Sequence, residues 1–379
     1  MAFISLGKID KNLIPILVGC VFCYLNRLLN QYEETILFDN VILTDIFISI
    51  SDIFTLIPYI IFKIRSKKNS INQNVNDINI NERIEYLYID NEKMKSQGKW
   101  KFIILSGIIF FIDDIMFVLT FKIKTNTWII YIFVTSIFYF LIFKSKLYRH
   151  HYLSIIVIIL LGISIDLVEG NLQNDFSENI LYLLVSILRV ILLSLNLVII
   201  KYTMEKKFVS PYEIALFNGI INLILFIIFA IIDHYYIRQY DYETYFNNFN
   251  VKELLVVLGV MSTQLGIYVC LFLTDKNTSP CHIFIIFVFG QLAYYYDFKS
   301  NSIIVIIFLL FILFFSLMFN EIIEINFLGL SYNIKRNIIK RADSEGFDSL
   351  IKGNEILDEG TEMDDNSTEL NNKESVIYK

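Results

Sequence analysis

Four ionisable residues lie deep inside long apolar runs of the chain: Asp52, Asp113, Asp114 and Arg189. A charged side chain is costly in the middle of a bilayer, so each of the four is a candidate for function. An arginine at that depth needs an anion, and the sequence offers three carboxylates. One Asp and Arg189 could form a purely structural ion pair, but two carboxylates would still remain.

This acidic excess suits a carboxylate that carries a coupling proton, or a substrate with a positive charge. Adjacent Asp113 and Asp114 point about 100° apart on a helix, so we expect only one to share a cavity with Asp52. Neutral side chains could add hydrogen bonds for binding, although joining helices is the alternative role for each. These neutral candidates are Asn26, Asn196 and Gln264. We expect no catalytic residue, no metal site and no cofactor.

Other charged residues lie near the ends of apolar runs, where water is within reach. Arg27 can extend its side chain to the membrane surface. Asp45 and Asp166 are expected to be solvated.

The composition identifies the class of protein that must position these residues. Of 379 residues, 55% are hydrophobic and only 18% charged, and the mean hydropathy is +0.57. These values exclude an ordinary soluble protein, a disordered chain, collagen and a disulfide scaffold. Continuous rather than alternating apolar runs favour helices over a β-barrel. We therefore predict an all-α polytopic membrane protein.

Ten transmembrane helices are predicted, each an apolar run of about 20 residues. Their ranges are 13–29, 40–62, 102–121, 127–143, 152–168, 180–200, 211–232, 253–273, 281–296 and 302–319. Ten spans place 25 of the 32 Lys and Arg on one side and 5 on the other. The positive-inside rule then predicts that both termini are cytosolic.

Two internal echoes divide the ten spans into inverted five-helix repeats. Leu25-Asn26 in the first span matches Leu195-Asn196 in the sixth, and the loop 124–127 matches the loop 276–279. Inverted repeats are typical of transporters. The predicted organisation is a cytosolic N-terminus (1–12), a first repeat (13–168) with a disordered cytosolic insertion (65–98), a second repeat (180–319), a juxtamembrane amphipathic helix (320–341) and an acidic disordered cytosolic tail (342–379).

The segment from Met204 to Glu213, followed by Asn218-Gly219, resembles a passage of the drug/metabolite transporter superfamily. It is most similar to solute carrier family 35 and to chloroquine-resistance-transporter-like proteins. Asp113 or Asp114 sits where relatives often place an Asp, and the junction 144–162 is also similar. The resemblance covers roughly residues 10–325 and implies ten helices in two inverted repeats, with alternating access in endomembranes. Asn218 departs from the family, where an acid is common.

The leading hypothesis is a secondary-active transporter or exchanger of a small polar metabolite. Cationic or zwitterionic substrates with proton coupling rank first, and a nucleotide-sugar antiporter is the alternative. An intramembrane enzyme is disfavoured because the four histidines show no metal-ligand spacing and the Cys20-x-x-Cys23 pair lies in an apolar run. A non-transporting membrane scaffold is the third alternative. Expected partners are the lipid bilayer and a small-molecule substrate, with a second copy in a homodimer as a further candidate and no nucleic acid.

Overall fold

The computed structural model describes residues 4–6, 13–31, 41–72, 98–120, 126–144, 147–171, 180–237, 251–298 and 303–325. The chain divides into two units, Met1–Asn326 and Phe327–Lys379. Every described residue belongs to the first unit. The predicted acidic tail, most of the 65–98 insertion and residues 326–341 lie outside the described residues.

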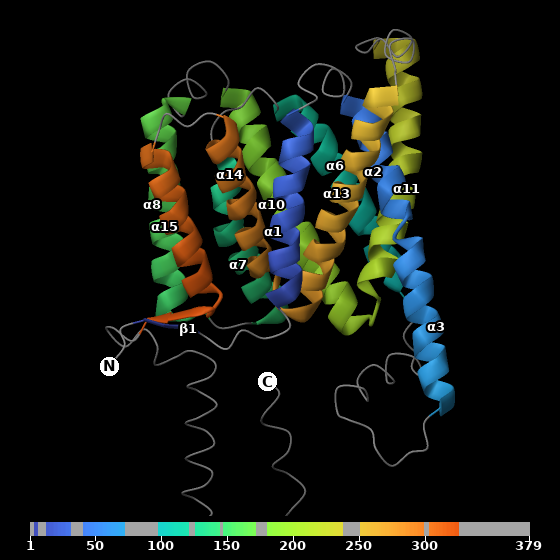
Figure 1. The fold of residues 1–379 in the computed structure, drawn as a ribbon, viewed down its shortest axis with the longest axis horizontal. Helices are drawn as coiled ribbons and strands as arrows, with labels where there is room; N and C mark the ends of the chain where they lie inside the picture. The colour runs from blue at the N-terminus through green and yellow to red at the C-terminus, as the bar shows by residue number, and fades with distance from the viewer. Residues whose placement is uncertain are drawn as a thin grey trace, which may run out of the picture. The chain divides into compact units, whose positions relative to one another are not determined.

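Helices make up nearly all of the described part (Figure 1). They are α1 (Ile14–Gln31), α2 (Val41–Ile53), α3 (Leu56–Asn72), α6 (Lys99–Thr120), α7 (Tyr131–Phe143), α8 (Arg149–Glu169), α10 (Ile180–Lys206), α11 (Pro211–Ile232), α13 (Val251–Asn277), α14 (Ile283–Phe298) and α15 (Ile303–Phe319). Short helical turns are η2 (Thr127–Ile130), η3 (Asp233–Ile237) and η4 (Pro280–His282). Strands β1 (Ile4–Leu6) and β2 (Ile323–Ile325) pair antiparallel, with Ser5 opposite Glu324.

Five helical stretches among the described residues are long and apolar enough to cross a membrane. They are Ile42–Ile64, Arg149–Glu169, Ile180–Lys206, Pro211–Tyr235 and Leu254–Asn277. Shorter apolar helices are Ile14–Asn26, Thr127–Phe143, Pro280–Ala293 and Ile303–Phe319. Large aliphatic side chains on the outer face of α8, such as Ile156 and Leu160, are exposed, as lipid contact requires. The chain is therefore an integral membrane protein.

The helices pack in pairs that are distant in sequence (Figure 1). α1 lies against α13 and α14, whereas α10 lies against α6 and α7. α2 packs on α11 and α13, and α11 also packs on α6. α8 and α15 lie side by side. Each helix buries one stripe against these neighbours, as the 3.6-residue period allows.

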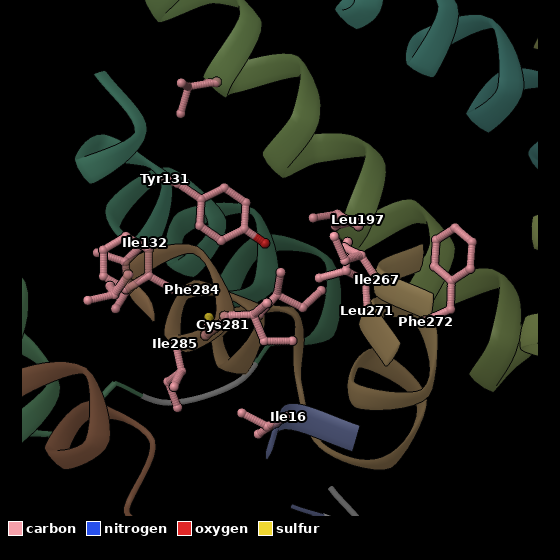
Figure 2. Close-up of a cluster of buried hydrophobic side chains, with 14 of the residues drawn as sticks. Ile16, Tyr131, Ile132, Leu197, Ile267, Leu271, Phe272, Cys281, Phe284 and Ile285 are labelled. Carbon is pink, nitrogen blue, oxygen red and sulfur yellow. The ribbon is translucent and has the colours of Figure 1, made fainter. Parts of the chain in front are cut away.

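The hydrophobic core gathers where α7, α10, α13 and α14 meet, and Figure 2 shows its central side chains. The ring of Tyr131 stacks on Phe284, with centroids 6.2 Å apart. The buried Tyr131 hydroxyl donates a hydrogen bond to the carbonyl of Pro280 at 3.1 Å. This contact joins the start of α7 to η4, so the polar end of an otherwise apolar ring is satisfied.

The predicted span 40–62 is interrupted, because α2 ends at Ile53 and α3 begins at Leu56. Pro58 has no N–H to donate to the carbonyl of Phe54, which breaks the helical ladder there. The Thr55 hydroxyl and the Thr55 N–H both donate to the carbonyl of Asp52, at 2.6 and 3.0 Å. A break in the backbone therefore directly follows one of the predicted site residues.

Three other expectations differ at the ends of elements. α3 continues to Asn72, past residue 65 where the insertion was expected to begin. α10 and α13 continue to Lys206 and Asn277, beyond the predicted ends at 200 and 273. The amphipathic helix predicted over 320–341 is wrong at its start, because residues 323–325 form β2. Apolar and polar residues alternate there, which is the period of a strand.

Candidate functional site

The predicted charged cluster is centred on an ion pair between α10 and α6. Arg189 Nε donates to Asp113 Oδ1 at 3.0 Å. The guanidinium carbon of Arg189 also lies 4.5 Å from the centre of the Phe117 ring. A planar guanidinium can bind a carboxylate at its edge while its face rests on an aromatic ring. The structure thus gives Arg189 the anion that its depth demands.

More carboxylates surround this pair. Electrostatic interactions link Asp114 with Asp45, Asp113, Asp52 and Arg189. Asp45 and Asp52 are 9% and 6% exposed, so both are buried. Asp45 Oδ2 and Asp52 Oδ1 have no hydrogen-bond partner among the described residues. The expectation that Asp45 is solvated is wrong: it belongs to this cluster, which we call the acidic cluster.

Local sequence explains how α2 contributes two members of the acidic cluster. Asp45 and Asp52 are seven residues apart, which is about two helical turns and places both on one face. Gly219 of α11 lets the two helices approach closely at this level, because it has no Cβ. The hydroxyls of Ser49, Ser51 and Thr55 donate to backbone carbonyls of α2, which weakens the helix around Asp52. The break before α3 follows at once.

A tyrosine that the sequence did not single out completes the cluster. The hydroxyl of Tyr268, on α13, interacts electrostatically with Asp114, Asp52, Asp113 and Asp45. Its ring packs edge-on against Phe110, with centroids 6.1 Å apart. Tyrosine is common in apolar spans, so only the tertiary packing distinguishes this residue. The cluster therefore draws on α2, α6, α10 and α13.

The chemistry of the acidic cluster follows from its imbalance of charge. Within the described residues it holds four carboxyl groups and one guanidinium. Several unpaired negative charges cannot be buried together without a large cost. The balance must come from bound protons, from a cation, or from both. The arrangement therefore supports exchange chemistry, in which the carboxyl groups release bound protons when they bind a cation.

The neutral candidates join helices. Asn26 Nδ2 donates to Gln264 Oε1 at 3.4 Å, and the Thr263 hydroxyl donates to Asn26 Oδ1 at 2.8 Å. Asn196 Nδ2 donates to the carbonyl of Ser106 at 3.3 Å. These hydrogen bonds join α1 to α13 and α10 to α6. Among the described residues they do not connect the neutral candidates to the acidic cluster.

The two remaining charged residues near span ends have different outcomes. Asp166 is 5% exposed, so the expectation that it is solvated is wrong. It accepts hydrogen bonds from the N–H and the side-chain amide of Asn126 at 3.0 and 2.7 Å. This pairing holds the end of α8 against the start of η2. The side chain of Arg27 lies outside the described part of the molecule.

A second buried group of charges was missed. Lys201 is 2% exposed, and its ammonium donates to the carbonyls of Asp275, Lys276 and Thr278 at 2.5, 3.0 and 3.0 Å. It also pairs with Glu205 at 3.0 Å. Because the last carbonyls of a helix lack partners, Lys201 caps the end of α13.

Asp275 is fully buried beside this cap. Neither of its carboxylate oxygens has a hydrogen-bond partner among the described residues, although its charge interacts with Lys201. Lys201 directly follows the predicted span 180–200, so the sequence indicated a position outside the membrane. This position directly after the apolar run 190–200 is also the only signal of the buried charge in the sequence.

A separate group could hold a metal ion. Ligand atoms of His150, His151 and Glu321 all lie within 4.8 Å of one another. The histidines were expected to offer no metal-ligand arrangement, and their spacing in sequence gave no signal. The third side chain, Glu321, follows α15, about 170 residues further along the sequence, so only the fold brings the group together.

Comparison with protein-family models and with curated protein sequences finds no match to this chain. The function therefore has to be argued from the geometry described above.

Proposed function

We propose that the protein is a secondary-active transporter that moves a small cationic or zwitterionic solute by alternating access, coupled to protons. The observation that carries the proposal is the acidic cluster, in which four carboxyl groups face one guanidinium. Ionisable residues inside membrane helices commonly mark substrate and proton pathways. A buried carboxyl group that binds either a proton or a cation provides the exchange on which coupling depends.

The interruption between α2 and α3 supports this role. Discontinuous helices at membrane depth are a recurring feature of transporter binding sites, since their free backbone groups can coordinate substrate or ions. Here the interruption covers residues 54–55, directly after α2 ends at Ile53. Such a hinge also allows one part of the span to move relative to the other.

We also propose that the fold consists of ten transmembrane helices in two inverted five-helix repeats. Exchanging α1, α2, α6, α7 and α8 with α10, α11, α13, α14 and α15 converts several of the main helix contacts into one another. The exchange is incomplete, because α14 packs on α15 without an equally extensive contact between α7 and α8 among the described residues. The α1–α13 and α1–α14 contacts become α10–α6 and α10–α7, and α2–α13 becomes α11–α6. The α2–α11 and α8–α15 contacts become themselves. A pseudo-two-fold axis produces this pattern.

Hydrogen bonds and helical turns show the same correspondence between the two sets of helices. Asn26 of α1 binds residues of α13, whereas Asn196 of α10 binds Ser106 of α6. A 3₁₀ turn precedes both α7 and α14. These features support membership of the drug/metabolite transporter superfamily, which we propose together with an endomembrane location and cytosolic termini.

A nucleotide-sugar antiporter is less well supported. A diphosphate needs cations, but Arg189 already binds Asp113 and lies among further carboxylates. The geometry therefore favours a positively charged group on the substrate.

Uptake by the purified protein in proteoliposomes tests the proposal. Pools of radiolabelled amines, amino acids and nucleotide sugars are offered with and without an imposed pH gradient. The variants are Asp52→Asn, Asp113→Asn and Asp114→Asn. Asp166→Asn is the matched control, because Asp166 is equally buried but its described hydrogen bonds go to Asn126.

The proposal expects gradient-driven uptake of a cation or zwitterion that at least one cluster variant abolishes and the control retains. Exchange of a nucleotide sugar that ignores the gradient and all cluster variants would reject the cation assignment. Failure to accumulate any solute in any pool, with correctly inserted protein, would reject transport and favour a scaffold.

A further inference from the structure

The start of α8 and the end of α15 bring three metal-ligating side chains together, apart from the acidic cluster. His150 and His151 occupy the first turn of α8, and Glu321 follows α15. Their ligand atoms lie within 4.8 Å of one another. The two imidazole rings are themselves only 4.0 Å apart, centroid to centroid. Two nitrogens and a carboxylate are a ligand set that zinc-class ions accept.

His150 gives the first independent sign that this group of side chains binds a ligand. It is 2% exposed, and neither ring nitrogen has a hydrogen-bond partner among the described residues. Its Nε2 lies 3.4 Å from Glu321 Oε1 without hydrogen-bond geometry. Two atoms bound to one tetrahedral Zn²⁺ at about 2.0–2.1 Å lie roughly 3.3 Å apart. The observed separation of 3.4 Å therefore allows both atoms to bind one metal ion, although a direct His–Glu ion pair has the same separation.

The backbone at Glu321 is the second sign. Its φ is 58°, in the left-handed region. The Ile322 N–H donates to the Leu317 carbonyl at 2.9 Å, and the Glu321 N–H donates to the Met318 carbonyl at 3.1 Å. These bonds form a Schellman motif, in which glycine is the usual residue at the position of Glu321. A strained residue kept where glycine would be relaxed suggests that its side chain is needed.

His151 adds a constraint on how a metal would bind. The Tyr148 N–H donates to His151 Nδ1 at 2.9 Å, which caps the start of α8. A nitrogen that accepts this bond has its lone pair occupied. Ligation through Nδ1 therefore replaces the bond, and ligation through Nε2 moves the ring proton to Nδ1 and also ends it. Metal binding must release the Tyr148 amide from its cap.

We propose that His150, His151 and Glu321 form a binding site for a divalent transition-metal ion of the zinc class. Water completes the coordination, and the ion fastens the first turn of α8 to the end of α15. Hard ions such as Mg²⁺ and Ca²⁺ prefer sites made only of oxygen ligands. The site is independent of the proposed transport function.

Metal titration of the full chain in detergent tests this proposal. The protein is first stripped with a chelator, and Co²⁺ is used as a spectroscopic probe, with Zn²⁺ in calorimetry. The variants are His150→Asn and Glu321→Gln. His234→Asn, whose residue lies in η3 after α11, is the control. We expect one Co²⁺ per chain with the intense visible absorption of a four-coordinate site, displaced by Zn²⁺.

Loss of either ligand should weaken binding by more than the roughly 10–100-fold that removal of an outer-shell partner costs, and the control should bind normally. Zn²⁺ should also speed hydrogen exchange at the Tyr148 amide. Absence of stoichiometric binding in the parent protein, or binding as tight as the parent's in both ligand variants, overturns the proposal.

The variant Glu321→Gly distinguishes a role of Glu321 in metal binding from a role in ending α15. Glycine relaxes the positive φ, so this variant should melt at the same or a higher temperature without metal. It should nevertheless lose Co²⁺ binding and any Zn²⁺-induced rise in melting temperature. A variant that keeps the rise would show that Glu321 serves only to end α15, against the proposal.

Discussion

Gly219 of α11 lies so close to Asp52 of α2 that a Cβ atom at residue 219 would stand 2.7 Å from the Cβ of Asp52. The same atom would lie 3.1 Å from the backbone carbonyl oxygen of Ser49. This contact involves the α2 backbone and the base of the Asp52 side chain, neither of which can rotate away. The position of Asp52 in the acidic cluster therefore depends on a glycine in another helix.

Replacing this glycine should destabilise the protein. We expect Gly219→Ala to lower the free energy of unfolding by about 1–3 kcal/mol, the usual cost of overpacking. Gly290→Ala is the control, because the nearest atom to its Cβ would be the Cys23 Cβ, at 3.8 Å, which is ordinary van der Waals contact. Thermal unfolding in detergent measures both. Equal melting temperatures for the two variants would contradict the close approach of α11 to the α2 backbone.

The two partners of the central ion pair should respond unequally to neutralisation. Arg189→Gln leaves four carboxyl groups without their cation, whereas Asp113→Asn leaves Arg189 beside the other acids. Losing one partner of a buried pair costs about 3–5 kcal/mol. We expect less here because 28% of the Arg189 side chain is exposed. Chemical unfolding should rank Arg189→Gln as the less stable variant, and the reverse order would contradict the charge imbalance.

The double variant Asp113→Asn with Arg189→Gln separates structure from function. A purely structural ion pair predicts that stability recovers and uptake recovers with it. A transport site predicts that stability recovers while gradient-driven uptake does not. The measurement is melting temperature and uptake on the same preparations.

Lys201 should be essential for the end of α13. Lys201→Met removes the donor for three carbonyls and the cation beside Asp275. Each unsatisfied buried group costs about 1–3 kcal/mol. Adding Asp275→Asn should recover part of the loss, since the amide carries no charge. Hydrogen exchange at residues 274–278 checks the cap, and unchanged protection in Lys201→Met would count against it.

The Asn26 contact should contribute modestly to stability. Interhelical hydrogen bonds in membranes contribute about 0.6 kcal/mol on average, so Asn26→Leu should lower stability by about that amount. The Thr263 hydroxyl keeps its bonds to the carbonyls of Gly259 and Val260. If Asn26 only holds α1 against α13 and does not contact the substrate, the KM for uptake should not change in Asn26→Leu. A large rise in KM with unchanged stability would instead assign Asn26 to the binding site.

Sequence predicted what depends on local composition. A run of about 20 apolar residues must form a helix in lipid, so the spans agree with helices to within a few residues at most ends. The need of Arg189 for a carboxylate also follows from local chemistry, although the choice of Asp113 required the structure. Pro58 was a visible sign of the interruption in the second span that the apolar count overlooked.

What could not be predicted depends on contacts between distant segments. The burial of Lys201 requires carbonyls 74 to 77 residues away in sequence. Asp45 resembles a solvated residue until α2 packs on α11 and α13. His150 and Glu321 meet only because α8 lies along α15. A pattern in one segment contains no information about such partners.

The short pairing of Ile4–Leu6 with Ile323–Ile325 has a topological consequence. Two strands joined by backbone hydrogen bonds must lie on the same side of a bilayer, because no backbone ladder can form across its hydrocarbon core. A chain that leaves one compartment and returns to it crosses the membrane an even number of times. Between Leu6 and Ile323 the parity of the crossings is therefore even, independently of how the positive charges are distributed.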